Sequence, residues 1–207
     1  MYQNDIKILQ TELLKLPKFW DGKVCVLELK KANYNWQQME WFGWYLEYKV
    51  KDILQKKFSF PGDKFGCTNF DLKGAINWDF KASAKSKVIL NDCSAMEQSI
   101  KKHGYHGEII AIFDVKYDDA NRTFYKWHEA LKGVVSKYVQ NKTTSKSRRR
   151  KCSVTLKQII LLILKNEDLK KLSIMKQGIN SNGQPRPYKY AFNLKTINEF
   201  ENYIIKI

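Results

Sequence analysis

The alternation of apolar and polar side chains is most regular in residues 76–84, INWDFKASA. Every second position is apolar, and the positions between them carry Asn77, Asp79, Lys81 and Ser83. A period of two is typical of a β-strand, in which successive side chains point to opposite faces. Residues 67–74, CTNFDLKG, form a second short strand pattern, and the link between the two segments is short enough for a β-hairpin.

A second pattern, with the period of an α-helix, spans residues 33–58. Its apolar stripe recurs at steps of four, three, four and three, and consists of Met39, Gly43, Leu46, Val50 and Ile53. This spacing predicts a helix whose apolar face packs on the core. Glu47 lies on a flank of that helix, where it either forms a surface ion pair with Lys51 or contributes to a site.

The remaining apolar patterns divide the chain into alternating strands and helices. They predict strands at residues 23–31, 87–92 and 107–117, and helices at residues 5–16, 94–104, 122–140 and 155–172. A capping box of Ser94 and Glu97 starts the helix at 94–104, and Gly133 interrupts the helix at 122–140.

Alternating strands and helices around a central hairpin predict the α/β class, with a mixed β-sheet flanked by helices. At 207 residues the chain is long enough for one well-buried core and a small appended portion. We therefore assign residues 1–152 to a core domain. Residues 153–207 are assigned to a C-terminal portion of one helix and a turn-rich segment, packed on that core.

Charge indicates the class of partner. The chain carries 37 Lys and Arg residues against 21 Asp and Glu residues, a net charge of +16. Such an excess favours binding of a polyanion, most commonly a nucleic acid. Basic residues gather in one polar stretch that we expect either to order on DNA phosphates or to remain a solvated loop: Lys146, Arg148, Arg149, Arg150 and Lys151. Arg186 and Lys189 lie in a Pro-containing turn and are further candidates for DNA contacts.

Several sequence features indicate the cellular compartment. The four cysteines are scattered without a CxxC pair, as expected for reduced thiols. Residues 1–16 carry charges within their apolar pattern, unlike a signal peptide, and the longest apolar run, 159–164, is too short to cross a bilayer. We therefore expect a cytoplasmic protein that is not bound to a membrane. The chain has neither a P-loop nor a Rossmann glycine pattern, so no nucleotide cofactor is expected.

The predicted hairpin gathers a set of side chains suited to hydrolysis. Asp79 and Lys81 point the same way, roughly 7 Å apart along the strand, and Asp71 can lie across the hairpin from Asp79. Two converging carboxylates are costly as bare anions but are natural ligands of Mg²⁺. A lysine beside them can hold the attacking water while the metal neutralises charge on a phosphate oxygen. The set therefore predicts metal-assisted hydrolysis of phosphodiester bonds.

Two alternatives to this centre remain open. Asp21, Glu28 and Lys30 have a comparable spacing on the predicted strand 23–31. We prefer the hairpin because a long helix carrying Glu47 precedes it and further strands and helices follow. The second alternative is an exposed polar strand face with incidental charge pairs and no chemistry.

The run NWQQMEWFGWYLEY, followed by Asp71, DFKASA and ILND, resembles the PD-(D/E)xK nucleases, and more narrowly small type II restriction endonucleases. The resemblance covers residues 33–130. It implies a mixed sheet flanked by helices, Mg²⁺ dependence, double-stranded DNA as substrate and a homodimer.

Carried over residue by residue, the resemblance assigns Asp71 and Asp79 as metal ligands, Lys81 as the residue that positions water, and Glu47 as an additional acid. No proline precedes Asp71, whereas the segment PGD ends at Asp63. Asp63 is therefore the alternative first acid.

The histidines are expected to have structural roles. His103 and His106 border glycines at the end of a predicted helix without further ligands, so we expect both in a loop. His128 lies among aromatic residues on a helix and is expected to be packed.

The function predicted from the sequence is a Mg²⁺-dependent type II restriction endonuclease. The alternatives are a structure-selective or repair nuclease with the same core, and a non-catalytic module that binds nucleic acid.

Overall fold

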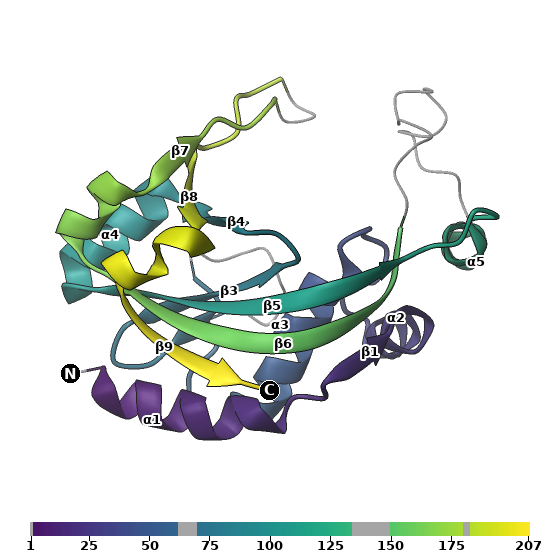
Figure 1. The fold of residues 1–207 in the computed structure, drawn as a ribbon, viewed down its shortest axis with the longest axis horizontal. Coiled ribbons are helices and arrows are strands. Elements are labelled where there is room, and N and C mark those ends of the chain that lie inside the picture. Colours follow the sequence, from purple (N-terminus) through teal and green to yellow (C-terminus); the bar gives the residue numbers. More distant parts are fainter. Residues whose placement is uncertain (1, 62–69, 134–149, 180–182) are drawn as a thin grey trace.

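A mixed β-sheet, strongly curled, forms the centre of the protein (Figure 1). The computed structural model describes residues 2–61, 70–133, 150–179 and 183–207. Within them the main sheet has six strands in the order β1-β6-β5-β3-β2, with β9 also paired to β6. These strands are β1 (Phe19–Asp21), β2 (Leu72–Lys73), β3 (Asn77–Ser83), β5 (His106–Tyr117), β6 (Lys151–Leu164) and β9 (Glu201–Lys206). Strands β3 and β5 are parallel and the other pairs are antiparallel, which confirms the α/β class with a mixed sheet.

Three helices cover one face of this sheet, and a fourth helix with a smaller sheet covers the other (Figure 1). The first face packs against α1 (Gln3–Glu12), α2 (Gly22–Lys31) and α3 (Trp41–Leu54). The second face packs against α4 (Cys93–His103) and a three-stranded sheet of β4 (Lys87–Asp92), β8 (Lys189–Asn193) and β7 (Ser173–Met175). The short helices η1 (Leu13–Lys15), η2 (Asn166–Lys171) and η3 (Leu194–Glu199) complete the fold, with α5 (Thr123–Lys132) at one end.

Strands β5 and β6 separate two hydrophobic cores. Ile109 and Ala111 of β5 belong to the core on the side of α1 to α3, whereas Ile110 between them belongs to the core under β4 and α4. A strand buried on both faces reads as a continuous apolar run, not as an alternation. The helix predicted at 155–172 is therefore wrong. Its apolar residues form most of β6, and only the polar end becomes η2.

The strand predicted at residues 23–31 is also wrong, because this segment is α2. The Asp21 carboxylate caps the helix by accepting hydrogen bonds from the backbone NH groups of Lys23 (2.9 Å) and Val24 (3.1 Å). Cys25 and Leu29, four residues apart, are buried on one face, while Val24 remains exposed. The cap and the buried helical face together outweigh the strand preference of the β-branched residues.

Other predicted elements are present with adjusted ends. The hairpin forms between β2 and β3, β4 has the predicted bounds, and α3 is shorter than the predicted 33–58. Helix α4 begins at Cys93 after Asp92, so the predicted cap at Ser94 is wrong. Helix α5 ends at Gly133, whose φ of 71° suits glycine, and residues 134–140 of the predicted helix lie outside the described residues.

The predicted division between residues 152 and 153 falls inside β6, the strand with the most partners in the described sheet. None of the helices in the described ranges is both long enough and apolar enough to cross a membrane.

Candidate active site

Strand β3 presents Asp79 and Lys81 on the same face, as their spacing predicts. Lys81 Nζ lies 3.5 Å from Asp79 Oδ1, and Asp79 is only 4% exposed. Burial alone would lower the pKa of Lys81, but the surrounding carboxylates, Asp79 foremost, raise it above its ordinary value. The lysine is therefore a fixed positive charge at the centre of the site.

Asp71 is tied to β3 by two hydrogen bonds. Its backbone NH donates to the Trp78 carbonyl (3.0 Å), and its Oδ2 accepts from the Phe80 backbone NH (2.8 Å). Burial raises the pKa of Asp71 to about 7, with Asp79 adding to the rise and Lys81 opposing it. The hairpin thus brings Asp71 beside the Asp79–Lys81 pair, as the sequence predicts.

Glu47 of α3 belongs to the same group. The Tyr34 hydroxyl donates a hydrogen bond to Glu47 Oε1 (2.6 Å). Burial raises the pKa of Glu47, whereas the Tyr34 hydrogen bond and the charge of Lys81 lower it. Because Glu47 interacts electrostatically with Lys81 and Asp71, the structure brings together all four predicted catalytic residues.

Two further ionisable residues come from β5, which lies parallel to β3. The register pairs Glu108 with Asp79 and His106 with Asn77. His106 Nε2 lies 3.2 Å from Asp79 Oδ2 and 3.5 Å from Glu108 Oε1, and Glu108 Oε2 lies 3.8 Å from Lys81 Nζ. Both residues are 0% exposed, so the prediction of His106 as a loop histidine is wrong.

The backbone of β5 approaches β3 closely at Gly107. A Cβ atom built on Gly107 would lie 2.2 Å from Cε3 of Trp78, which packs over that position. Glycine is therefore required between His106 and Glu108, so that both side chains can lie on the face of Asp79 while Trp78 fills the opposite face.

Charge interactions hold the buried cluster together. Burial alone would raise the pKa of Asp79, but Lys81 and His106 outweigh it and the pKa is lowered. Burial would lower the pKa of His106, yet its contacts with Asp79 and Glu108 raise it to about 9. Among the residues of this site, four carboxyl groups face one lysine and one histidine, so the site attracts cations.

Sequence reasoning missed His106 and Glu108. Glu108 lies in the predicted strand 107–117 and His106 immediately precedes that strand. Their spacing of two residues was a usable signal, since in a continuous strand it places both on one face. What the sequence does not show is that β5 pairs directly with β3, because that pairing joins segments separated by β4 and α4.

The N-terminal alternative does not form a comparable cluster. Asp21 caps α2, and Glu28 accepts a hydrogen bond from the Tyr45 hydroxyl (2.7 Å) and pairs with Lys49 (3.0 Å). Lys30 Nζ lies over the Trp36 ring, 5.0 Å from its centroid. These three residues lie on a helix and at its cap, so no strand face presents them together. Asp63, the alternative first acid, lies outside the described residues.

The basic residues predicted to contact DNA are only partly described. Lys146, Arg148 and Arg149 lie outside the described residues. Arg150 packs over the Tyr125 ring at 5.0 Å, and Lys151 pairs with Glu40.

The two basic residues of the C-terminal portion occupy different surroundings. Arg186 is exposed, whereas Lys189 on β8 lies 3.2 Å from Asp92 on β4. Strand β4 also carries Asn91, whose Nδ2 donates to Asp79 Oδ2 (2.7 Å). Lys189 is therefore on the strand next to one that contributes to the site.

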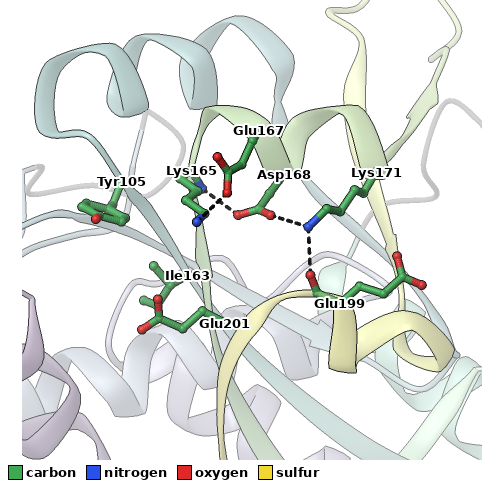
Figure 2. A pocket seen from close by; sticks show the side chains of 8 residues that line it. All are labelled: Tyr105, Ile163, Lys165, Glu167, Asp168, Lys171, Glu199 and Glu201. Atoms are coloured by element: carbon green, nitrogen blue, oxygen red, sulfur yellow. Dashed lines mark hydrogen bonds and ion pairs between the residues drawn. The ribbon is translucent and has the colours of Figure 1, made fainter.

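A cavity of about 130 Å³ lies apart from this cluster, around η2, η3 and the ends of β6 and β9 (Figure 2). Its lining contains Tyr105, Ile163, Lys165, Glu167, Asp168, Lys171, Glu199 and Glu201. Lys171 pairs with Asp168 (2.9 Å) and Lys165 pairs with Glu167, as Figure 2 shows. Because both lysines are neutralised by neighbouring acids, the cavity offers no free cationic group to a ligand.

Comparison with known proteins gave no match: no protein-family model, no curated protein and no solved structure matches this chain.

Proposed function

We propose that the protein is a Mg²⁺-dependent endonuclease of the type II restriction class, which hydrolyses phosphodiester bonds at specific sites in double-stranded DNA. The observation that carries the proposal is that Asp79 lies 3.5 Å from Lys81 on β3, and that Asp71 of the hairpin and Glu47 of α3 both interact electrostatically with this pair. Carboxylates around a charged lysine are the set that metal-assisted phosphodiester hydrolysis requires.

The residues present suit a divalent cation. Burial and neighbouring acids raise the pKa of Asp71 to about 7, so the charge of Lys81 compensates its ionised form only in part. A hard cation held by Asp71 and Asp79 would supply the remaining positive charge. When bound, Mg²⁺ would stabilise negative charge that develops on a phosphate oxygen.

The protein's own side chains would position the attacking water and hold the metal ligands in place. Lys81 stays protonated because its pKa is raised, so it can donate hydrogen bonds to the attacking water or to a phosphate oxygen, but it cannot act as a general base. The hydrogen bond that the Phe80 NH donates to Asp71 Oδ2, together with the backbone bond from the Asp71 NH to the Trp78 carbonyl, fixes the carboxylate before substrate arrives. Glu47, held by the hydrogen bond from Tyr34, provides a further acid whose carboxyl group interacts with Lys81.

The charge of the whole chain favours DNA as the substrate. A net charge of +16 attracts a polyanion although the site itself is rich in carboxylates. The pairing of β4 with β8 brings Lys189 to the sheet that covers the site, and Arg186 is exposed in the segment before β8. We assign these two residues to DNA contacts, and propose that the working form is a homodimer on a palindromic sequence.

Cleavage of several sequenced linear DNAs, in Mg²⁺ and in EDTA, tests this proposal. We expect discrete Mg²⁺-dependent fragments from the wild type and none from Lys81→Ala. Lys30→Ala is the matched control, because Lys30 lies on α2 outside the cluster, and it should cut normally.

The alternatives give different patterns. A repair nuclease would cut only branched or damaged DNA, and a binding module would retain DNA without cutting it. Either result would overturn the restriction assignment. Sedimentation of the protein, alone and with a DNA duplex that carries its cleavage sequence, tests the homodimer, which should sediment with the mass of two chains.

A further inference from the structure

We propose that Asp79, His106 and Glu108 form a second metal position, selective for Mn²⁺, Co²⁺ and similar transition ions over Mg²⁺. One ligand atom from each residue lies within 4.8 Å of the others. The three come from adjacent parallel strands, where the register sets Glu108 beside Asp79. The inference extends the metal requirement of the proposed function, and it rests on that function only because the two metal positions share Asp79. Metal binding at the second position does not require DNA.

The distances within the cluster fit the edges of a coordination polyhedron. His106 Nε2 is 3.2 Å from Asp79 Oδ2 and 3.5 Å from Glu108 Oε1. Metal–ligand bonds of about 2.0–2.2 Å separate neighbouring ligands by roughly 3.0–3.5 Å. His106 Nε2, the nitrogen that faces both carboxylates, makes no hydrogen bond, although its side chain is only 1% exposed. Buried polar atoms left in this way indicate a missing partner.

Outer contacts orient each of the three ligands. Ser99 Oγ of α4 lies 3.2 Å from His106 Nδ1, so the imidazole can donate its Nδ1 proton there while an incoming metal ion displaces the Nε2 proton to solvent and binds the Nε2 lone pair. The Asn91 side chain donates to Asp79 Oδ2 (2.7 Å), and its backbone NH donates to Glu108 Oε1 (3.3 Å). Such contacts position metal ligands before the ion binds.

Lys81 does not occupy the proposed position. Its Nζ faces Asp79 Oδ1 and Glu108 Oε2, whereas His106 faces the other oxygen of each carboxylate. The two carboxylates are thus contacted by the lysine through one pair of oxygens and by His106 through the other pair. A divalent ion bound on the His106 side would add positive charge beside Asp79 and Glu108, two buried carboxylates that share the single charge of Lys81.

Ligand chemistry sets the selectivity. Mg²⁺ prefers oxygen ligands and retains water, whereas an imidazole nitrogen favours transition ions such as Co²⁺, Ni²⁺ and Zn²⁺. A set of one nitrogen and two carboxylates accepts Mn²⁺ and Co²⁺ readily. Mg²⁺ is left to the carboxylate oxygens of Asp71 and Asp79.

Metal binding without DNA tests the proposal. The full chain, dialysed against EDTA and then freed of it, is titrated with Co²⁺ by visible absorption and with Mn²⁺ and Mg²⁺ by calorimetry. We expect His106→Asn to weaken Co²⁺ and Mn²⁺ binding at least tenfold and to leave Mg²⁺ binding unchanged. The control is His103→Asn, because His103 lies at the end of α4 outside the cluster.

A second variant covers the case in which His106→Asn does not fold. Ser99→Ala removes only the contact that orients the imidazole, and should weaken Co²⁺ binding about tenfold. The proposal is overturned if the wild type binds no Co²⁺, or if Ser99→Ala and every folded His106 variant bind Co²⁺ as the wild type does.

Failure of this inference is distinguishable from failure of the proposed function. DNA cleavage in Mg²⁺ without histidine-dependent Co²⁺ binding refutes the second metal position alone. Histidine-dependent binding without cleavage of any DNA supports the metal position and refutes the nuclease.

Discussion

Replacement of Asp71 by asparagine should stabilise the metal-free protein. The carboxylate is forced to ionise beside Asp79 and Glu47 in a buried site, which is why its pKa rises from 3.8 to about 7. Asparagine removes this cost and keeps an oxygen that can accept the 2.8 Å hydrogen bond from the Phe80 NH. Most substitutions of buried polar residues destabilise a protein, so the expected direction is unusual.

The magnitude follows from the pKa. A rise from 3.8 to about 7 corresponds to about 4 kcal/mol of unfolding free energy at a pH above both values. Solvent at the rim of the site screens part of this cost, so we expect Asp71→Asn to gain about 2–4 kcal/mol at pH 8. Asp71 of the folded wild type takes up a proton as the pH falls through 7. The difference in unfolding free energy between Asp71→Asn and the wild type should therefore shrink near pH 4.5 to about a quarter of its value at pH 8.

Urea unfolding in EDTA at pH 8 and at pH 4.5 measures both differences. Asp52→Asn is the matched control, since Asp52 is exposed on α3 and its substitution should change the free energy by less than about 0.5 kcal/mol. Adding Mg²⁺ should stabilise the wild type more than Asp71→Asn. An Asp71→Asn variant less stable than the wild type at pH 8 in EDTA would refute the reasoning.

Three further predictions concern single side chains. Lys81→Met should reduce the cleavage rate by about 10²–10³ or more, below detection. It should also cost about 3–5 kcal/mol of unfolding free energy at pH 8, because it leaves buried carboxylates unpaired. Cleavage assays and urea unfolding measure the two effects, and the control Lys30→Met should show neither. His128 is 1% exposed, and burial lowers its pKa to about 4, so the wild type should lose about 3 kcal/mol as the pH falls from 6.5 to 4. His128→Gln should lack this loss in thermal or urea unfolding across that range, and an unchanged pH profile would contradict the burial argument. Asp21→Ala should lower the unfolding free energy by about 1 kcal/mol through loss of the α2 cap, with cleavage unchanged; a loss of cleavage in folded protein would return the N-terminal segment to consideration as the centre.

The site could be predicted from the sequence to the extent that it depends on local geometry. The alternation in β3 alone places Asp79 and Lys81 on one face, and a short hairpin brings Asp71 to them. The helical stripe of α3 places Glu47 on a flank of the helix. These residues follow from periods of two and of about 3.6 residues, which the sequence displays directly.

The rest depends on contacts between distant segments. The pairing of β5 with β3 brings Glu108 to Asp79, and no local pattern specifies it. The apolar run at residues 159–164 is compatible with a buried helix and equally with a central strand buried on both faces. Its pairing with β5 on one edge and β9 on the other makes it a strand, and no local pattern shows that pairing. At residues 23–31 the apolar and β-branched residues favour a strand, but Asp21 caps a helix there.

The central place of β6 has a consequence for how the protein is made. Glu108 and His106 sit on β5, and β6 supplies the ladder on the other edge of that strand. During synthesis, β5 leaves the ribosome well before β6, and until then one edge of β5 is unpaired. Contacts so far apart along the chain slow folding, and an unpaired edge strand invites association with other chains. A fragment ending at residue 152 would retain the proposed catalytic and metal-binding residues and still lack most of β6, the strand that completes their support. We expect the site to become rigid only after the C-terminal strands have joined the sheet.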